Sequence, residues 1–230
     1  MFDALSTLMY SVSVWALPAL TAITLHEAAH GWVAWKLGDD TAMRAGRVSF
    51  NPARHVDPVG TLLVPGLLLA MKAPFLFGYA KPVVPVDFSR LRQPRRDMIW
   101  VAAAGPGVNL AMAYLAALLM YVTILFPDIA RPWLFQNLKN ALLLNVVLAV
   151  FNMLPLPPLD GGRVVLGLLP RSLAVPYAKL ERYGMAIIIG LLIVPPLIGT
   201  QIGMKLDLLP WLILTPVEIL IDTILTLAGH

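Results

Sequence analysis

Residues 98–126 read MIWVAAAGPGVNLAMAYLAALLMYVTILF and contain no Asp, Glu, Lys or Arg. A helix that crosses the hydrocarbon core of a bilayer needs about 20 consecutive, mostly apolar residues. This segment is long enough, and four others resemble it: about 5–37, 137–156, 179–198 and 208–228. The sequence therefore predicts five transmembrane helices.

A shorter hydrophobic segment, residues 59–71 (VGTLLVPGLLLAM), carries Pro65 and Gly66 near its middle. Apolar segments of about 10–14 residues are often re-entrant rather than spanning, so we expect this one to enter the membrane without crossing it. Two polar, basic stretches, residues 38–58 and 81–97, are rich in turn formers and are expected to form loops and short β-strands.

The composition agrees with a membrane protein. The 230 residues are 59% hydrophobic and 13% charged, whereas soluble domains average about 45–50% apolar and about 25% charged residues. We therefore predict an all-α polytopic membrane protein with one re-entrant segment and short β-strand or loop elements. Its expected partner is the lipid bilayer and not nucleic acid, because a net charge of +4 in a membrane protein usually reflects basic cytoplasmic loops.

Residues 26–30 read His-Glu-Ala-Ala-His, an H-E-x-x-H pattern within the helical run TLHEAAHGWVAWKLG. Positions i and i+4 lie on the same face of an α-helix, so His26 and His30 can bind one ion. Glu27 is turned about 100° around the helix axis and can act as a general base toward a water molecule at the metal. This is the arrangement of zinc proteases.

The location of this pattern helps to separate a metal site from a chance pair of histidines. A lone H-E-x-x-H can also be two histidines at a helix interface. Here three ionisable residues fall within an apolar helix, where acidic or basic residues cost about 2.5–3.5 kcal/mol each. A divalent cation is the natural compensating partner, and the absence of cysteine excludes thiolate ligands. We predict one zinc ion per chain.

A catalytic zinc site usually has three protein ligands and one open position. The remaining histidines are poor candidates, because His55 lies in a polar loop and His230 is the last residue. Asp160, in FNMLPLPPLDGGRV, follows a hydrophobic helix and a proline-rich break, and Gly161 and Gly162 then free the backbone for an unusual path. The alternative is that Asp160 is the N-cap of the short helix that follows. We predict the ligand role.

Two asparagines are further candidate site residues. Asn109 lies in AAGPGVNLAM with Gly105, Pro106 and Gly107, and Asn152 follows a second hydrophobic run. Either asparagine could donate a hydrogen bond to substrate or to an oxyanion, or could tie helices together. The glycines are expected to allow close helix packing.

Three segments together resemble the site-2 protease family of intramembrane zinc metalloproteases: HEAAH at 26–30, AGPGVN at 104–109 and NMLPLPPLDGGR at 152–163. NPARHVDPVGT at 51–61 and GYAKPVVP at 78–85 are similar to the small prokaryotic members that lack a PDZ domain. The resemblance implies zinc ligands at His26, His30 and Asp160, a catalytic glutamate at Glu27, and motif positions near the active site at Asn109 and Asn152.

The expected function is hydrolysis of peptide bonds in membrane proteins with a transmembrane segment, as in regulated intramembrane proteolysis. A single integral-membrane metalloprotease domain would cover residues 1–230, with a catalytic core at about 5–170 and C-terminal helices at 179–228. Residues 77–86 (FGYAKPVVPV) are the candidate strand edge that holds unwound substrate by β-augmentation. The residues alone leave open a metal-binding membrane transporter or a non-catalytic membrane scaffold.

The metal and the charges together predict a topology. Unless a broken helix brings Asp160 back to mid-membrane, one ion can reach the histidines and Asp160 only if helices 5–37 and 137–156 run parallel. Parallel helices require that 59–71 is re-entrant. All Lys and Arg except Arg131, Lys139 and Lys205 then lie on one side, as the positive-inside rule favours for the cytoplasm. We expect a multi-pass protein of the prokaryotic cytoplasmic membrane, with the N-terminus outside, the C-terminus cytoplasmic, and the active site opening to the cytoplasm.

Overall fold

The structure is a computed structural model that describes residues 2–54, 84–203 and 208–230. Within those residues five helices are long and apolar enough to cross a membrane: Leu5–Lys36, Pro94–Leu125, Arg131–Asn152, Arg171–Ile202 and Trp211–Ala228. They correspond to the five predicted helices, and no strand occurs in the same part of the chain. The all-α polytopic class is confirmed. Residues 59–71 and most of 77–86 lie outside the described residues.

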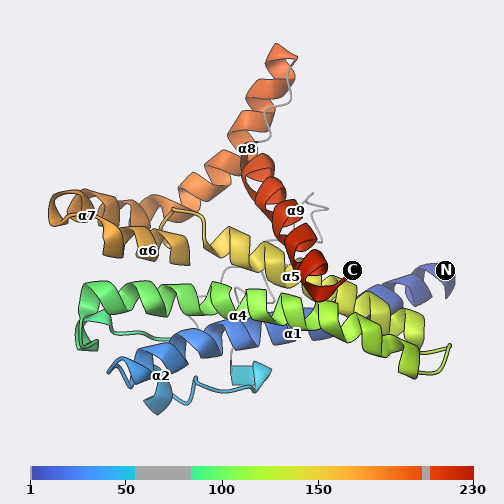
Figure 1. Cartoon of the computed structure of the whole chain (residues 1–230). Coiled ribbons are helices and arrows are strands. Elements are labelled where there is room, and N and C mark those ends of the chain that lie inside the picture. Colours follow the sequence, from blue (N-terminus) through green and yellow to red (C-terminus); the bar gives the residue numbers. More distant parts are fainter. Residues whose placement is uncertain (1, 55–83, 204–207) are drawn as a thin grey trace.

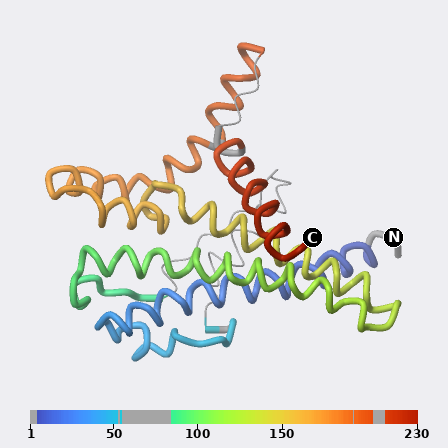
Figure 2. The backbone as a smooth tube through the Cα atoms, in the orientation of Figure 1, coloured from blue at the N-terminus to red at the C-terminus, as the bar shows by residue number. Residues whose placement is uncertain are grey.

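Three long helices, α1 (Phe2–Lys36), α4 (Pro94–Val122) and α5 (Arg131–Asn152), form the central bundle (Figures 1 and 2). α1 and α5 run in the same direction, and α4 runs in the opposite one. Trp133 Nε1, near the start of α5, donates to Ser13 Oγ at 2.9 Å in the first half of α1. The parallel pair that the metal-ligand argument required is present.

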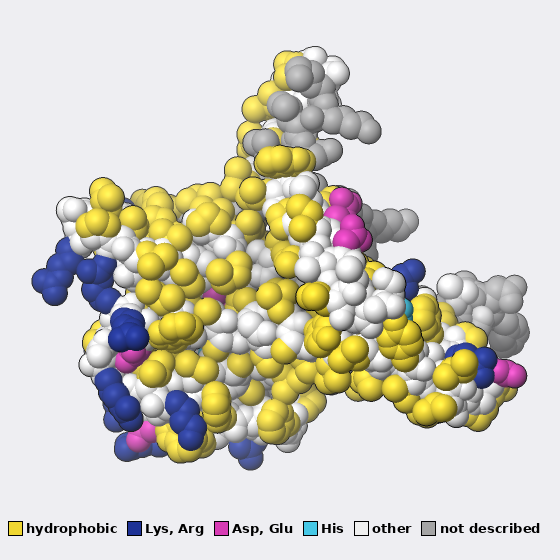
Figure 3. All heavy atoms as spheres, in the orientation of Figure 1, with side chains coloured by type: hydrophobic (Ala, Val, Ile, Leu, Met, Phe, Trp, Pro, Cys, Tyr) yellow, Lys and Arg dark blue, Asp and Glu magenta, His cyan; other side chains and the backbone are white. Residues whose placement is uncertain are grey.

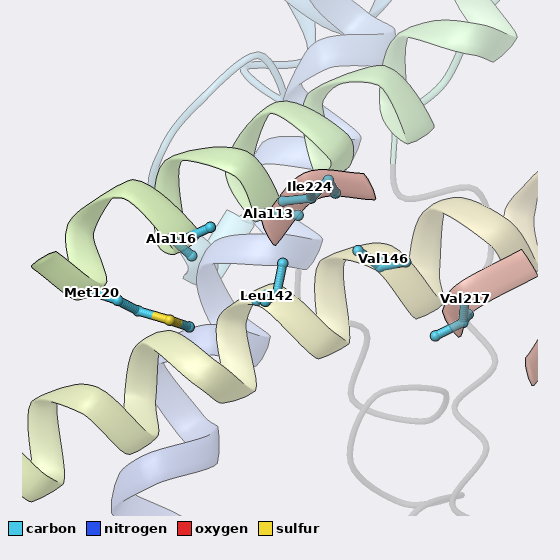
Figure 4. Close-up of a cluster of buried hydrophobic side chains, with 8 residues drawn as sticks. Ala113, Ala116, Met120, Leu142, Val146, Val217 and Ile224 are labelled. Atoms are coloured by element: carbon cyan, nitrogen blue, oxygen red, sulfur yellow. The ribbon is translucent and has the colours of Figure 1, made fainter. Parts of the chain in front are cut away.

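Small residues line the contact between α4 and α5. Ala113 and Ala116 of α4 are at most 4% exposed and pack with Leu142 and Val146 of α5 (Figure 4). Alanine side chains let two helix backbones approach closely, which is the main way that helices associate in lipid. This contact holds α4 and α5 together.

The chain on both sides of residues 55–83 lies at the C-terminal end of α1. The buried carboxylate of Asp39 accepts from the backbone amides of Thr41 at 3.0 Å and Asp87 at 2.7 Å. The amide of Arg92 donates to the carbonyl of Leu37 at 3.0 Å. These bonds fix the start of α4 beside the end of α1, so the two helices run antiparallel.

Three short elements occupy this end of the bundle: α2 (Thr41–Arg44), η1 (Pro52–Arg54) and η3 (Phe88–Arg90). Asp87 caps η3, and its Oδ1 accepts from the hydroxyl of Ser89 at 2.6 Å and from its amide at 3.0 Å. These hydrogen bonds to Ser89 lower the pKa of Asp87 from its ordinary value. Residues 47–50, for which the sequence allowed a short strand, form an irregular bend.

After α5 the chain continues as α6 (Asp160–Leu168), α7 (Arg171–Ala178), η5 (Lys179–Tyr183), α8 (Gly184–Ile202) and α9 (Leu208–Ala228). α6 packs on the first half of α4: a Cβ added at Gly167 would lie 2.5 Å from Ile99 Cγ1. The guanidinium of Arg95 in α4 donates to the carbonyl of Leu169. Helix α6 is therefore attached to α4 along its length.

The last residues of the chain lie at the C-terminal end of α4. The hydroxyl of Tyr121 donates to the carbonyl of Gly229 at 2.6 Å, and His230 Nε2 lies 3.0 Å from the carbonyl oxygen of Ala117. In Figure 4 Val217 lies beside Val146, and Ile224 lies nearer the C-terminal half of α4. Helix α9 therefore runs in the same direction as α4.

This placement differs from the expected one. We expected the N-terminus outside and the C-terminus in the cytoplasm, that is, on opposite sides of the membrane. In the structure α8 points away from the bundle instead of running along it (Figure 1). Both ends of the chain consequently lie toward the end of the bundle where α1 begins.

Candidate metal centre

Three ligand-type side chains meet between α1, α4 and α6. His26 Nε2 and His30 Nε2 each lie 3.3 Å from Asp160 Oδ2 and 3.0 Å from one another. The three side chains are 10%, 12% and 11% exposed, so the group is largely enclosed. In the described part of the chain, this is the group of His, Cys, Asp or Glu whose ligand atoms are close enough to hold a metal ion.

The second nitrogen of each imidazole is held by a neighbour on α4. His26 Nδ1 lies 2.5 Å from Asn109 Oδ1, and His30 Nδ1 lies 2.7 Å from the carbonyl oxygen of Val101. Both partners accept hydrogen bonds, so we assign the proton of each neutral ring to Nδ1, which leaves a lone pair on each Nε2. Metal-binding histidines usually donate their second N–H in this way.

Asp160 does not cap the helix that it begins. It is the first residue of α6, the N-cap is Leu159, and no side-chain capping bond is made. Its Oδ2 is buried and has no hydrogen-bond partner among the described residues. Burying a carboxylate oxygen without a partner is costly, and two lone pairs facing it add to that cost. A cation between the three atoms would remove both penalties, so the residues present fit a metal ion.

Gly105 leaves room for this group on the α4 side. A Cβ added there would lie 2.4 Å from His30 Nε2 and 2.6 Å from His26 Nε2, inside van der Waals contact. Any side chain at this position would occupy the space next to the ligand atoms. The expected packing role of this glycine is therefore present, and its packing partners are the two candidate ligands.

Gly161 and Gly162 let α6 begin against the turn before it. A Cβ at Gly161 would lie 2.2 Å from the carbonyl oxygen of Met153, and one at Gly162 would lie 2.5 Å from Pro157 N. Neither glycine has a positive φ. These glycines were expected to free the backbone, whereas in the structure they allow a close backbone approach that leaves no room for a side chain.

Comparison with known proteins shows which family this chain is similar to. The model of peptidase family M50 matches residues 122–195. A Bacillus subtilis protein described as "Putative zinc metalloprotease YwhC" is 36% identical over 180 residues, which cover 76% of this chain and 78% of that protein. The chain belongs to peptidase family M50. A Mycolicibacterium smegmatis protein with the same description and the name Rip2 is 32% identical over 179 residues, or 77% of this chain and 66% of the relative. No solved structure matches significantly.

Family M50 membership confirms the resemblance to site-2 proteases that the three sequence segments indicated. The chain is a zinc metalloprotease of the intramembrane type and a multi-pass membrane protein. The transporter and scaffold alternatives are not favoured.

The three other predicted site residues of this M50 protease, Glu27, Asn109 and Asn152, lie in different surroundings. Glu27 is partly buried on α1 next to His26 and is not part of the three-residue ligand group. Asn109 is fully buried and contacts His26 directly. Asn152 is partly buried, and its Nδ2 donates to the carbonyl of Leu148 in its own helix at 3.0 Å. The structure thus places Asn109 against His26, whereas the hydrogen bond of Asn152 stays within α5.

One residue of this network was missed by the sequence argument. Asn145 Oδ1 accepts from Asn109 Nδ2 at 2.7 Å, and Asn145 is fully buried. A signal was available, because Asn137, Asn140 and Asn145 recur along a helix that is apolar enough to cross a membrane. Polar residues inside membrane helices commonly bond to other helices.

Proposed function

We propose that His26, His30 and Asp160 bind one catalytic zinc ion per chain and that Glu27 is the general base of peptide hydrolysis. The observation that carries this proposal is the convergence of two Nε2 atoms, at 3.3 Å, on a buried carboxylate oxygen with no hydrogen-bond partner. Three protein ligands leave a fourth zinc position open for reactants. Membership of family M50 supports zinc as the ion.

Each residue then has a defined task. A zinc ion bound there would lower the pKa of a water molecule toward about 7 and polarise the scissile carbonyl. The carboxylate of Glu27 accepts the proton of that water and returns it to the leaving amine nitrogen. Asn109 has both its amide oxygen and its amide nitrogen engaged, so it orients His26 instead of contacting substrate. Asn152 remains the candidate for a substrate contact.

The substrate is a membrane protein with a transmembrane segment. Its helix must unwind near the scissile bond, because the amides of a helix are otherwise bonded within it. Residues 77–86 are the proposed strand edge for the unwound chain. Support comes from the described end of that stretch: Val84 is buried against Gly31, the residue after His30, and a Cβ at Gly31 would lie 3.0 Å from Val84 Cγ1.

The active site opens to the cytoplasm, and the N-terminus lies outside. Lys and Arg side chains gather at the end of the molecule where α2 and α7 lie (Figure 3), which is the end of α1 that follows His30. The positive-inside rule assigns such an end to the cytoplasm. Because His230 lies beside Ala117 at the other end of the bundle, we now assign the C-terminus to the outer side with the N-terminus.

The experiment that tests the function compares wild type with Glu27→Gln. Zinc content is measured on the purified proteins, and membrane proteins of cells carrying each version are compared by quantitative proteomics. We expect equal zinc content and accumulation of uncleaved substrates in the variant. Loss of zinc in the variant would indicate that Glu27 is a metal ligand, as expected for a transporter site. An unchanged membrane proteome with zinc retained would show that Glu27 is not the catalytic base.

A further inference from the structure

Asn145 and Asn109 form a hydrogen-bond chain that starts on α5 and ends on His26. Asn145 Nδ2 donates to the carbonyl of Ala141 at 2.9 Å, and Asn109 Nδ2 donates to Asn145 Oδ1 at 2.7 Å. Asn109 Oδ1 lies 2.5 Å from His26 Nδ1. Both asparagines are fully buried, so water does not compete for these bonds.

The chain can run in one direction only. A backbone carbonyl accepts and never donates, so the carbonyl of Ala141 requires the NH₂ group of Asn145 to face it. Asn145 then presents its oxygen to Asn109, so Asn109 must donate from its own NH₂ group. The carbonyl of Ala22, 3.3 Å from Asn109 Nδ2, also requires the NH₂ group of Asn109 on that side. Asn109 is left with its oxygen toward His26, which therefore carries its proton on Nδ1.

We propose that Asn145 is a positioning residue for the metal centre: acting through Asn109, it fixes the tautomer and ring orientation of His26 so that Nε2 faces His30 and Asp160. This inference rests on the proposed zinc site. Without Asn145 only the 3.3 Å contact with Ala22 opposes a flip of the Asn109 amide. A flipped amide would present NH₂ to His26 Nδ1, favour the proton on Nε2, and block metal binding there.

The test measures zinc affinity of the detergent-solubilised full chain by competition with a chelator. Asn145→Leu removes the amide at similar volume. Partners that orient a ligand typically change metal affinity by about 10- to 100-fold when removed, and we expect a loss in that range. The matched control is Asn140→Leu: Asn140 lies on the same helix, is 3% exposed, and donates to the carbonyl of Val14 at 3.0 Å. The control should lower thermal stability but keep the zinc affinity of wild type.

A double-mutant cycle separates positioning from general damage to the bundle. If Asn145 acts through Asn109, then Asn109→Leu with Asn145→Leu should bind zinc no more weakly than Asn109→Leu alone. Additive losses would overturn the inference, as would wild-type affinity in Asn145→Leu or equal losses in the Asn140 control. Should Asn145→Leu not fold, Asn145→Ser is measured in its place, with the same outcomes. Wild type that binds no zinc would instead refute the proposed function.

Discussion

Gly105 leaves the space beside the Nε2 atoms of His26 and His30, the two candidate histidine ligands. Gly105→Ala would place a Cβ 2.4–2.6 Å from the Nε2 atoms of both histidines. Overpacking of this kind costs about 1–3 kcal/mol, and 1.4 kcal/mol is a factor of ten in binding. We expect zinc affinity to fall by about ten-fold or more, measured by chelator competition.

Gly107→Ala is the control for this prediction. Gly107 lies on the same helix two residues away, and a Cβ added there meets nothing within 4 Å. Zinc affinity should stay at the wild-type value. Equal affinities for the Gly105 and Gly107 variants would mean that α4 does not approach the histidines as closely as the structure has it.

At the residue scale the sequence could predict which three candidate ligands come together, but not the hydrogen bonds that hold them in place. The i, i+4 spacing placed His26 and His30 on one face, and elimination pointed to Asp160. Asn109 contacts His26, and Asn145 contacts Asn109. Both contacts depend on which faces of three separate helices pack together. That pairing arises from tertiary packing, and no local pattern in one sequence contains it.

At the scale of elements, the start of α6 determines where Asp160 lies. Gly161→Ala would bring a Cβ within 2.2 Å of the carbonyl oxygen of Met153, so the helix would have to move and carry Asp160 with it. We expect a lower thermal midpoint and weaker zinc binding, each measured on the purified protein. In an unconstrained helix the same change would stabilise the protein by roughly 1 kcal/mol, so the clash has to cost more than this to give the expected loss.

The contrasting variant is Gly190→Ala in α8. An added Cβ there meets nothing within 4 Å, and alanine is the better helix former. Thermal stability should be unchanged or slightly raised, with zinc affinity retained. If Gly161→Ala behaved like Gly190→Ala, the close approach of the turn to α6 would be wrong.

The five long helices were predictable, because length and hydropathy alone identify a membrane-spanning segment. Their packing was predictable only where chemistry supplied a constraint: the requirement that one ion reach the histidines and Asp160 predicted that α1 and α5 run parallel. No such constraint acts on α8 and α9. Counting crossings predicted the two termini on opposite sides, whereas in the structure Gly229 and His230 contact Tyr121 near the end of α4.

At the scale of the whole molecule, orientation in the membrane can be tested by cysteine labelling, because the native chain contains no cysteine. Met43→Cys and Ser89→Cys lie on exposed positions at the end of α1. Ile129→Cys, 92% exposed, lies between α4 and α5 at the other end. The first two should label only from the cytoplasm and the third only from outside. Labelling of Met43→Cys and Ser89→Cys from opposite sides would contradict the topology.

The central claim concerns the three ligands, and Asp160 is the one that no sequence pattern fixes by spacing. The most direct measurement is the zinc content per chain of purified wild type and Asp160→Ala, determined by elemental analysis in the same preparation. We predict one zinc per chain in wild type and a large loss in the variant, together with loss of cleavage. Full zinc occupancy and activity in Asp160→Ala would contradict the account.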